Sequence, residues 1–488
     1  MIIGAGFSGI GAAYRIAERN PGGCATSCWN DATASAAPGT CSGTGVRSDS
    51  SIFSLSWPWE PWVRKEGVAD GDHIREYMED TAHKRGIFPH IHFNTHVLSA
   101  DWDSATDTWT VHALENGTRK TYRGRFVFFG SGYYNYDEGY TPPDFPGLEN
   151  FKGATVHPQF WPEDLDYTGK KVIVVGSGAT AISLIPALAQ KAAKVTMLQR
   201  SPTYLLAGSR VNPIIEAVRK KVMPPRRISH AFARYFAVAF ESVVWFLART
   251  VPGGVAARSS GRRTSAGCLR AIRSTCTSSR ATTCGISDYA WWPTATYSKR
   301  SPTAARWWSP TTSTASTTPG GVMLKSGQHL EADIIVTATG LQLQALGGVR
   351  ITLDGNEIKP QERFSYKAHM LEDVPNLIWC IGYTNASWTL RADMTARAAA
   401  KLIEYMNSHG YTHAFPHLGG EPIAEKPAWD IQAGYVLRNL HALPKSGLKR
   451  PWVVRQNYLA DAFDHHFIDK IDEDMTFGRV SSPVRAAG

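Results

Sequence analysis

Cysteine is scarce in most of this 488-residue chain. Six of its seven cysteines fall in two stretches of unusual composition, residues 23–44 and 256–318, and only Cys380 lies elsewhere. We therefore expect no disulfide framework of the kind that holds small secreted domains together. The sequence also has no spacing of cysteine, histidine and carboxylate residues that predicts a metal site, and no internal repeat.

Long apolar runs and a leader sequence are lacking too. Met1 leads directly into a glycine-rich turn, with no basic and apolar leader before it, so we expect a cytoplasmic protein. The most apolar segment, residues 231–248, is interrupted by Arg234 and Glu241. A membrane span needs 18 or more nearly uncharged residues. We expect a core helix here, with weak contact between this helix and a membrane surface as the alternative.

Acidic residues are nearly missing from one segment. The formal net charge is +10, but residues 256–318 hold nine Lys and Arg against one acid, Asp288, which gives 9 − 1 = +8. Because most of the excess lies in one unusual segment, the charge does not predict a nucleic-acid partner. The length and the 43% hydrophobic content predict two or three domains with large cores.

The chain opens on a glycine-rich turn of the form G-x-G-x-x-G, followed by a helical pattern. Its glycines would let the backbone approach a pyrophosphate at the helix N-terminus. Its position at the start of the chain, with a second copy downstream, favours FAD as the ligand. The predicted cofactor-binding residues are Gly4, Gly6, Phe7, Ser8 and Gly9. A ribose-binding carboxylate should follow about 20 residues later, but residues 23–44 show no strand-like alternation and offer only Asp31.

A second turn, of the form G-x-G-x-x-A, follows the strand pattern that begins at Lys170. The next strand ends in Arg200 and Ser201, with no acid beside them. An arginine at this place accommodates the 2′-phosphate of NADP, whereas an acid would hold the ribose hydroxyl of NAD. We therefore predict NADPH at this turn, bound by Gly176, Ser177, Gly178, Ala179, Thr180, Ala181, Arg200 and Ser201.

Two further strand patterns, residues 125–132 and 332–340, end in small residues as strands of dinucleotide-binding domains do. The predicted fold is α/β, with two Rossmann-like domains and a small helical subdomain. The NADP domain is inserted in the FAD domain. We expect the FAD domain at residues 1–150 and 332–488, and the NADP domain at 151–331, with a helical insertion at about 205–255 and the unusual stretch 256–318.

Residues 151–162 lie between the two turns and read F-x-G-x-x-x-H-x-x-x-W-P. Phe151, Gly153, His157 and Trp161 occupy the fixed positions, and Pro162 follows. This segment resembles the fingerprint of Baeyer-Villiger monooxygenases, which are class B flavoproteins, and the chain is similar to their ethionamide-activating branch. An ordinary domain linker is the alternative interpretation.

The resemblance implies roles for several residues outside the turns. Asp49, in the R-x-D-S segment, would contact the cofactors and orient a catalytic arginine, although a turn or helix cap is the alternative. His157 would lie at the joint of the two domains, and Asp49 and His157 are the predicted catalytic residues. Further flavin-binding residues would be Arg47, Ser48, Val97 through its backbone, Thr339, Gly340 and Asn385.

The family's chemistry implies the function. NADPH would reduce FAD, and a C4a-peroxyflavin formed with O₂ would convert a small-molecule ketone to an ester or lactone, or oxidise a sulfide. Three alternatives stay open. One is a flavin-containing monooxygenase that oxidises only nitrogen or sulfur. Another is a flavin disulfide reductase, although Cys24 and Cys28 have the wrong spacing. The last is a non-enzymatic remnant that binds NADP. The sequence predicts neither the substrate nor the oligomeric state.

The two unusual stretches have an explanation at the level of the gene. Residues 36–44 can be encoded so that dropping two nucleotides gives G-T-W-D-L-F-R-Y, and residues 278–289 and 289–300 likewise give K-P-R-Y-N-L-W-D-L-R-L and R-V-V-A-D-G-D-L-L-K-A. All three strings resemble the family at those places. We interpret both stretches as compensated frameshifts rather than as low-complexity disorder. As written, the chain lacks the ribose carboxylate, the G-T-W-D loop and the family's catalytic arginine.

Overall fold

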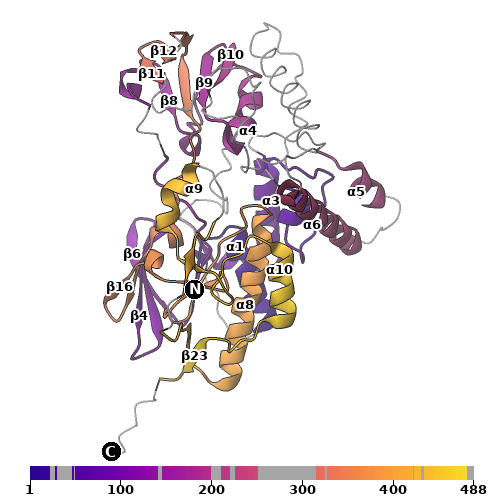
Figure 1. The fold of residues 1–488 in the computed structure, drawn as a ribbon, viewed down its shortest axis with the longest axis vertical. Coiled ribbons are helices and arrows are strands. Elements are labelled where there is room, and N and C mark those ends of the chain that lie inside the picture. Colours follow the sequence, from indigo (N-terminus) through magenta and orange to yellow (C-terminus); the bar gives the residue numbers. More distant parts are fainter. Residues whose placement is uncertain are drawn as a thin grey trace, which may run out of the picture.

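The computed structural model shows two parallel sheets, one above the other in Figure 1, joined by two linkers. The structure describes residues 1–21, 28–29, 47–48, 50–140, 145–198, 210–219, 226–250, 315–324, 327–420, 423–429 and 434–480, and its account of residues 28–29, 226, 244–250 and 315 is limited to the backbone. Asp31, Asp49, Arg200 and Ser201 lie outside the described residues, as does most of the two unusual stretches.

The first sheet has the strand order β19-β7-β1-β2-β3, and all its neighbours are parallel. The strands are β1 (Ile2–Ile3), β2 (Cys28–Trp29), β3 (Ile91–His92), β7 (Val127–Phe129) and β19 (Leu377–Trp379). Strand β2 falls in the stretch where no strand was expected. Its backbone nevertheless pairs with β1 and β3, because ladder hydrogen bonds use backbone groups that every sequence supplies.

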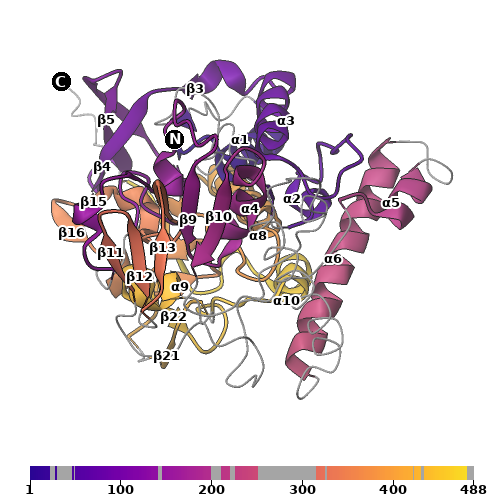
Figure 2. The same ribbon diagram turned by 90° about the horizontal axis from the view of Figure 1, so that it is seen from above.

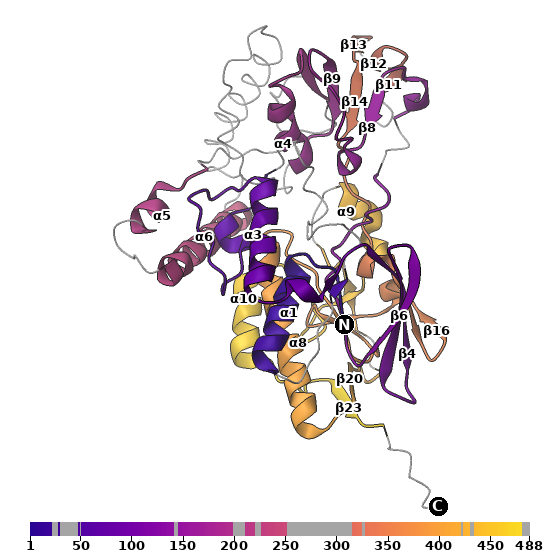
Figure 3. The same cartoon turned by 180° about the vertical axis from the view of Figure 1, so that it is seen from behind.

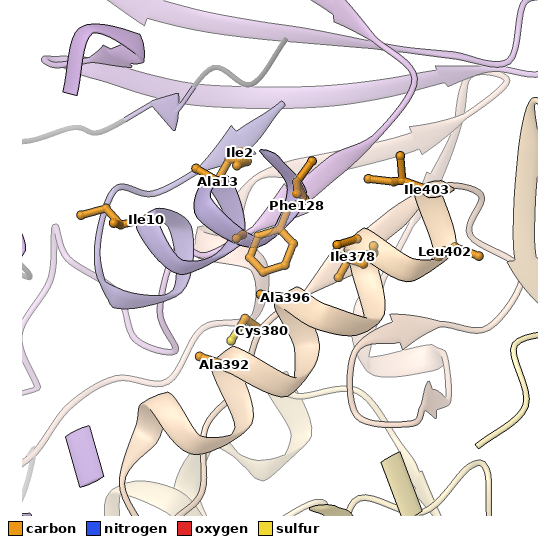
Figure 4. Close-up of a cluster of buried hydrophobic side chains, with 14 of the residues drawn as sticks. Ile2, Ile10, Ala13, Phe128, Ile378, Cys380, Ala392, Ala396, Leu402 and Ile403 are labelled. Atoms are coloured by element: carbon orange, nitrogen blue, oxygen red, sulfur yellow. The ribbon is translucent and has the colours of Figure 1, made fainter. Parts of the chain in front are cut away.

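Two helices cover one face of this sheet, α1 (Phe7–Arg19) and α8 (Trp388–His409). They approach closely because both carry alanines on the facing sides, among them Ala13 of α1 and Ala396 of α8, which are at most 1% exposed. Figure 4 shows Phe128 of β7 and Ile378 of β19 filling the space between this helix pair and the sheet. The predicted helices after the first turn and near residues 392–406 are both present.

A second, mixed five-stranded sheet packs on the other side, with the order β16-β15-β4-β5-β6. Its strands are β4 (Thr95–Asp103), β5 (Thr108–Glu115), β6 (Thr118–Gly124), β15 (Arg350–Leu353) and β16 (Asn356–Ile358). Trp109, which is fully buried, anchors this sheet in a core that it shares with Ile3 of β1 and Phe129 of β7.

The upper parallel sheet has the order β10-β9-β14-β8, and α4 (Ala179–Leu188) packs against it. Its strands are β8 (Ala154–Val156), β9 (Lys171–Val175), β10 (Lys194–Leu198) and β14 (Ile334–Thr337). The prediction that the chain returns to the first domain at residue 332 is wrong, because β14 pairs with β8 and β9. The return follows β14, near Gly340. A short antiparallel sheet of β11 (Ala315–Thr318), β12 (Gly321–Leu324) and β13 (His329–Glu331) adjoins this unit.

A helical region lies beside α1 and α8 of the first unit and contains α2 (Ile52–Leu55), α3 (Gly71–Lys84), α5 (Pro213–Ala217) and α6 (Arg226–Thr250). Figure 2 shows α5 and α6 at the edge of the molecule. The expected core helix, α6, buries only one face, and that face carries Arg234 and Glu241, whereas Tyr235 is 71% exposed. Arg234 donates to the backbone carbonyls of Ser54 and Ser56, and Glu241 accepts from Ser54 Oγ at 2.8 Å. None of the described helices is long and apolar enough to cross a membrane.

The remaining part of the described chain completes the first unit. It contains β17 (Ser365–Tyr366), β18 (Met370–Leu371), β20 (His413–Pro416), β21 (Glu425–Lys426), α9 (Gly434–Asn439), β22 (Ser446–Gly447), α10 (Tyr458–Phe463) and β23 (Met475–Gly478). Helix α9 lies between the two sheets in the view from behind (Figure 3). Its Val436 is fully buried in the same core as Ile3, so α9 belongs to the first unit.

Candidate cofactor-binding site

The first glycine turn is packed so closely that two of its three glycines cannot carry a side chain. Gly4 has a φ of +98°, and a Cβ atom added there would lie 2.5 Å from the carbonyl oxygen of Gly130. A Cβ atom at Gly9 would lie 1.8 Å from the carbonyl oxygen of Gly4. Gly6 differs, because no protein atom lies within 4 Å of the place where its Cβ would stand. The turn therefore has an open side at Gly6.

The second turn repeats this arrangement. Gly176 has a φ of +133°, and a Cβ atom there would lie 2.1 Å from the carbonyl oxygen of Ala338. Gly178 has open space in front of it, and Ala181 is buried against the sheet. The half-exposed Ser177 and the exposed Thr180 complete the turn on its solvent side.

Both open glycines are the N-caps of helices. Gly6 precedes α1 and Gly178 precedes α4, and neither helix receives a hydrogen bond from a capping side chain or carries an acid in its first turn. The first N–H groups of a helix need partners, and the helix dipole favours an anion there. A dinucleotide pyrophosphate fits this geometry, since it would use the space that the missing side chains leave open. Each of the two turns thus has an open helix N-terminus that a dinucleotide pyrophosphate would fit.

Ser8 links the first turn to the start of α8. The indole Nε1 of Trp388 donates to Ser8 Oγ at 3.2 Å, and its ring stacks on Tyr133 with 4.9 Å between centroids. Trp388 also occupies the space beside Gly382, where any Cβ atom would clash with the indole. The thiol of Cys380 lies beside Ser8, and burial raises the pKa of this thiol to about 11. The sequence pointed to the segment around Trp388 but not to its bond with Ser8.

Phe7, a predicted cofactor residue, uses its ring for packing. It lies 5.0 Å from Trp57, whose indole Nε1 donates to the backbone carbonyl of Phe7. Trp57 and Trp62 are at most 3% exposed. Both tryptophans therefore pack in the interior of the protein.

Two linkers connect the sheets, and they run side by side in opposite directions. Tyr134 forms an antiparallel bridge with Leu343, the Asn135 N–H donates to Gln342 O at 2.8 Å, and the Gln344 N–H donates to Tyr133 O at 3.0 Å. Further along, Thr339 Oγ1 donates to the carbonyl of Tyr140 at 2.7 Å. The chain thus leaves and re-enters the first unit through one paired ribbon.

The fingerprint segment packs against this ribbon. A Cβ atom at Gly139 would lie only 2.6 Å from the ring of His157, so the imidazole lies directly on the first linker. A backbone contact with Gly340 brings the second linker to the same ring. Burial lowers the pKa of His157, so the ring is neutral near pH 7. Gln159, which occupies a variable position of the motif, donates through Nε2 to the carbonyls of Asn135 and Tyr136 at 2.8 Å each.

The R-x-D-S segment begins beside the helical region. Arg47 Nε donates to Asp70 Oδ1 at 2.9 Å, and Arg210 donates to Asp70 Oδ2 at 2.7 Å. These two arginines lower the pKa of Asp70, although its burial opposes them. The Ser48 hydroxyl accepts from the Ala69 N–H at 3.0 Å. Asp49 itself lies outside the described residues, so its predicted role stays a prediction. Arg47 and Ser48 on its N-terminal side are fixed by their hydrogen bonds to Asp70 and Ala69.

Two other predicted flavin contacts occupy different places. Val97 lies in β4, where its side chain is buried in the core that also contains Ile3. Asn385 lies just before α8, and its Nδ2 donates to the carbonyl of Gln456 at 2.7 Å. Its Oδ1 is buried and has no hydrogen-bond partner among the described residues. Such an acceptor suits a ligand with N–H or O–H donors.

Comparison with known proteins places the chain in a family. Residues 67–219 match the family described as flavin-binding monooxygenase-like. The chain is 38% identical to the FAD-containing monooxygenase EthA of Mycolicibacterium smegmatis, over 97% of this chain and 95% of that protein. It is also 38% identical to MymA of Mycobacterium tuberculosis, a putative FAD-containing monooxygenase, over 95% and 94% of the two chains.

Solved structures with lower identity share the fold. A cyclohexanone monooxygenase with bound cyclohexanone, described as in the Rotated conformation, superposes with a TM-score of 0.67 at 19% identity and covers 98% of each chain. A steroid monooxygenase bound to NADP gives 0.59 at 22% identity, over 86% of this chain and 87% of that one. The predicted α/β fold with two Rossmann-like domains is confirmed. Because relatives 38% identical span nearly the whole chain, the protein belongs to the family of FAD-containing flavin-binding monooxygenases and is an oxidoreductase.

Proposed function

We propose that this protein uses NADPH and FAD to insert one oxygen atom of O₂ into a small-molecule ketone, as a Baeyer-Villiger monooxygenase, with sulfide oxidation as a further activity. One observation carries the proposal. The fingerprint residues His157 and Gln159 contact both linkers between two glycine turns that are each open to a pyrophosphate. The name of the cyclohexanone monooxygenase that shares the fold supports a ketone as the substrate class.

The chain's own residues bind and orient the two nucleotides. The first turn would hold the FAD pyrophosphate at Gly6 and the N-terminus of α1, and the second would hold the NADPH pyrophosphate at Gly178 and the N-terminus of α4. The start of α8, fixed to Ser8 through Trp388, would face the flavin with the positive end of its dipole. FAD supplies the redox chemistry and the activation of O₂. The protein contributes positioning and electrostatics.

Purified protein tests the proposal directly. Absorbance near 450 nm reports bound FAD and separates an enzyme from a remnant that binds only NADP. NADPH oxidation that depends on a ketone, with an ester or lactone as the product, supports the Baeyer-Villiger assignment. Oxidation of a thioether or an amine without any ketone product would instead favour the nitrogen- and sulfur-oxidising alternative.

The choice of NADPH depends on Arg200, which follows β10 and lies outside the described residues. A charge-assisted contact contributes about 1.5 to 3 kcal/mol. We expect Arg200→Ala to raise the KM for NADPH about tenfold or more and to leave the KM for NADH nearly unchanged. Steady-state kinetics with both nucleotides, on a chain with both unusual stretches returned to the family's frame, measure this. Equal effects on the two would contradict a role at the 2′-phosphate.

His157 should matter for the joint and not for holding FAD. We expect His157→Ala to keep FAD bound, because the ring packs against Gly139 and Gly340 and not against the first turn. NADPH-dependent flavin reduction should slow, or NADPH oxidation should become uncoupled and yield hydrogen peroxide. Stopped-flow absorbance and a peroxide assay, on a chain with both unusual stretches returned to the family's frame, check this. Normal turnover with stoichiometric product would rule the role out.

A further inference from the structure

Helix α9 touches both linkers at the point where they leave the upper sheet. The guanidinium carbon of Arg438 lies 3.6 Å from the centre of the Tyr140 ring, and Tyr140 belongs to the first linker. On the second linker, a Cβ atom at Gly340 would lie 3.0 Å from Cβ of Tyr435 and 3.8 Å from a terminal nitrogen of Arg438. The φ of +106° at Gly340 fits this close approach. One short helix thus contacts both connections between the sheets.

These contacts join a helix of the first unit to linkers that lead into the second unit. They can persist only if the two units keep one orientation relative to each other. Val436 anchors α9 in the core of the first unit, whereas the linkers continue into β8 and β14 of the second. Gln159 of the second unit donates to the carbonyls of Asn135 and Tyr136 in the same ribbon. The ribbon is therefore held from the first unit by α9 and from the second by the fingerprint.

We propose that Arg438 and Tyr435 form a positioning site that holds the paired linkers against the first unit and so fixes the orientation in which the second glycine turn faces the first. The inference rests on the proposed function, because this orientation matters for chemistry only if a nucleotide on the second turn reacts with one on the first. A guanidinium stacked on an aromatic ring suits the task, since it gives an attraction that tolerates small sliding of the ring.

Hydrogen exchange tests this positioning site, which we call the clamp, without requiring turnover. The amides of Asn135 and Gln344 donate across the ribbon, and their exchange reports how often it opens. We expect Arg438→Ala and Tyr140→Leu to speed deuterium uptake in residues 131–140 and 338–344 about tenfold, as loss of one cation–π contact implies. Tyr140→Phe keeps the ring face and should behave as wild type. Arg350→Ala, at an exposed position of β15, is the matched control, and uptake in β4 and β5 should not change in any variant.

Flavin reduction separates positioning from simple stabilisation. In a chain with both unusual stretches returned to the family's frame, both clamp variants should reduce FAD with NADPH about tenfold more slowly under anaerobic conditions, while their affinity for NADP⁺ stays within about twofold of the same chain without these substitutions. Unchanged exchange in Arg438→Ala and Tyr140→Leu would overturn the clamp, and faster exchange with wild-type reduction would overturn its positioning role. Should Arg438→Ala not fold, Tyr140→Leu removes the same contact from the other side. If the repaired chain without these substitutions were not reduced by NADPH, the proposed function would fail, and exchange alone would decide on the clamp.

Discussion

In a chain with both unusual stretches returned to the family's frame, Gly6→Ala is expected to leave the protein folded and to weaken its hold on FAD at least tenfold. Gly6 has a φ of −81°, which alanine adopts without strain, and an added Cβ atom would meet no protein atom within 4 Å. That atom would instead stand where the pyrophosphate approaches the start of α1. Losing one charge-assisted hydrogen bond costs about 1.5 to 3 kcal/mol, which corresponds to a change in Kd of about tenfold or more.

Gly9→Ala is the matched comparison, because the same added atom would lie 1.8 Å from the carbonyl oxygen of Gly4. The backbone of the turn must then move, and we expect a loss of stability of about 1 to 3 kcal/mol in addition to the loss of FAD. Gly178→Ala, at the open glycine of the second turn, should keep FAD and weaken NADPH. Thermal unfolding and titration with each nucleotide measure all three variants. Stoichiometric FAD in Gly6→Ala would show that the first turn does not hold the pyrophosphate.

The elements that the sequence predicted well are those with local causes. A turn that needs positive φ at Gly4 and Gly176 can be filled by little else than glycine, so it is visible in the residues themselves. The helix after each turn follows from periodicity. The pairing of strands has no such local cause, because it depends on segments that are distant in the sequence. Residues 332–340 read as a buried strand in either sheet, and only the pairing of Ile334 and Ile335 with β8 and β9 assigns them to the second.

The buried charges of α6 are a second feature that could not be predicted from local sequence. Arg234 and Glu241 appeared to interrupt an apolar helix, yet they lie on its buried face because the backbone carbonyls of Ser54 and Ser56 and the hydroxyl of Ser54 receive them. No pattern within α6 can reveal partners that lie about 180 residues earlier in the chain. Burying a charge is tolerated only with such partners.

Site residues at fixed motif positions could be predicted from the sequence, and site residues elsewhere could not. His157 occupies a fixed position of the fingerprint and could be predicted, whereas Gln159 occupies a variable position although it makes two hydrogen bonds to the first linker. Arg438 lies outside the glycine turns, the fingerprint and the R-x-D-S segment. Its role depends on Tyr140, which lies about 300 residues away in sequence and 3.6 Å away in space.

Returning residues 23–44 and 256–318 to the alternative reading frame is expected to have the largest effect of all. As written, the chain lacks the carboxylate that would hold the adenosine ribose and the G-T-W-D loop beside the flavin. Each lost contact to FAD costs about 0.5 to 3 kcal/mol, and several together turn a retained cofactor into one that dissociates. The missing oxyanion-stabilising arginine should cost a further factor of about 10² to 10³ in rate.

The experiment compares the chain as written with a chain in which both stretches are repaired. Because the described residues already form both glycine turns and the paired linkers, we expect the unrepaired protein to fold and to bind NADP⁺. Only the repaired protein should purify with FAD near one per chain and oxidise NADPH in response to a ketone. Repair of residues 23–44 alone should restore FAD without restoring full turnover, because the arginine that is still missing acts on the reaction and not on the flavin's affinity. Equal FAD content and equal ketone-dependent rates in the two full chains would refute the frameshift interpretation.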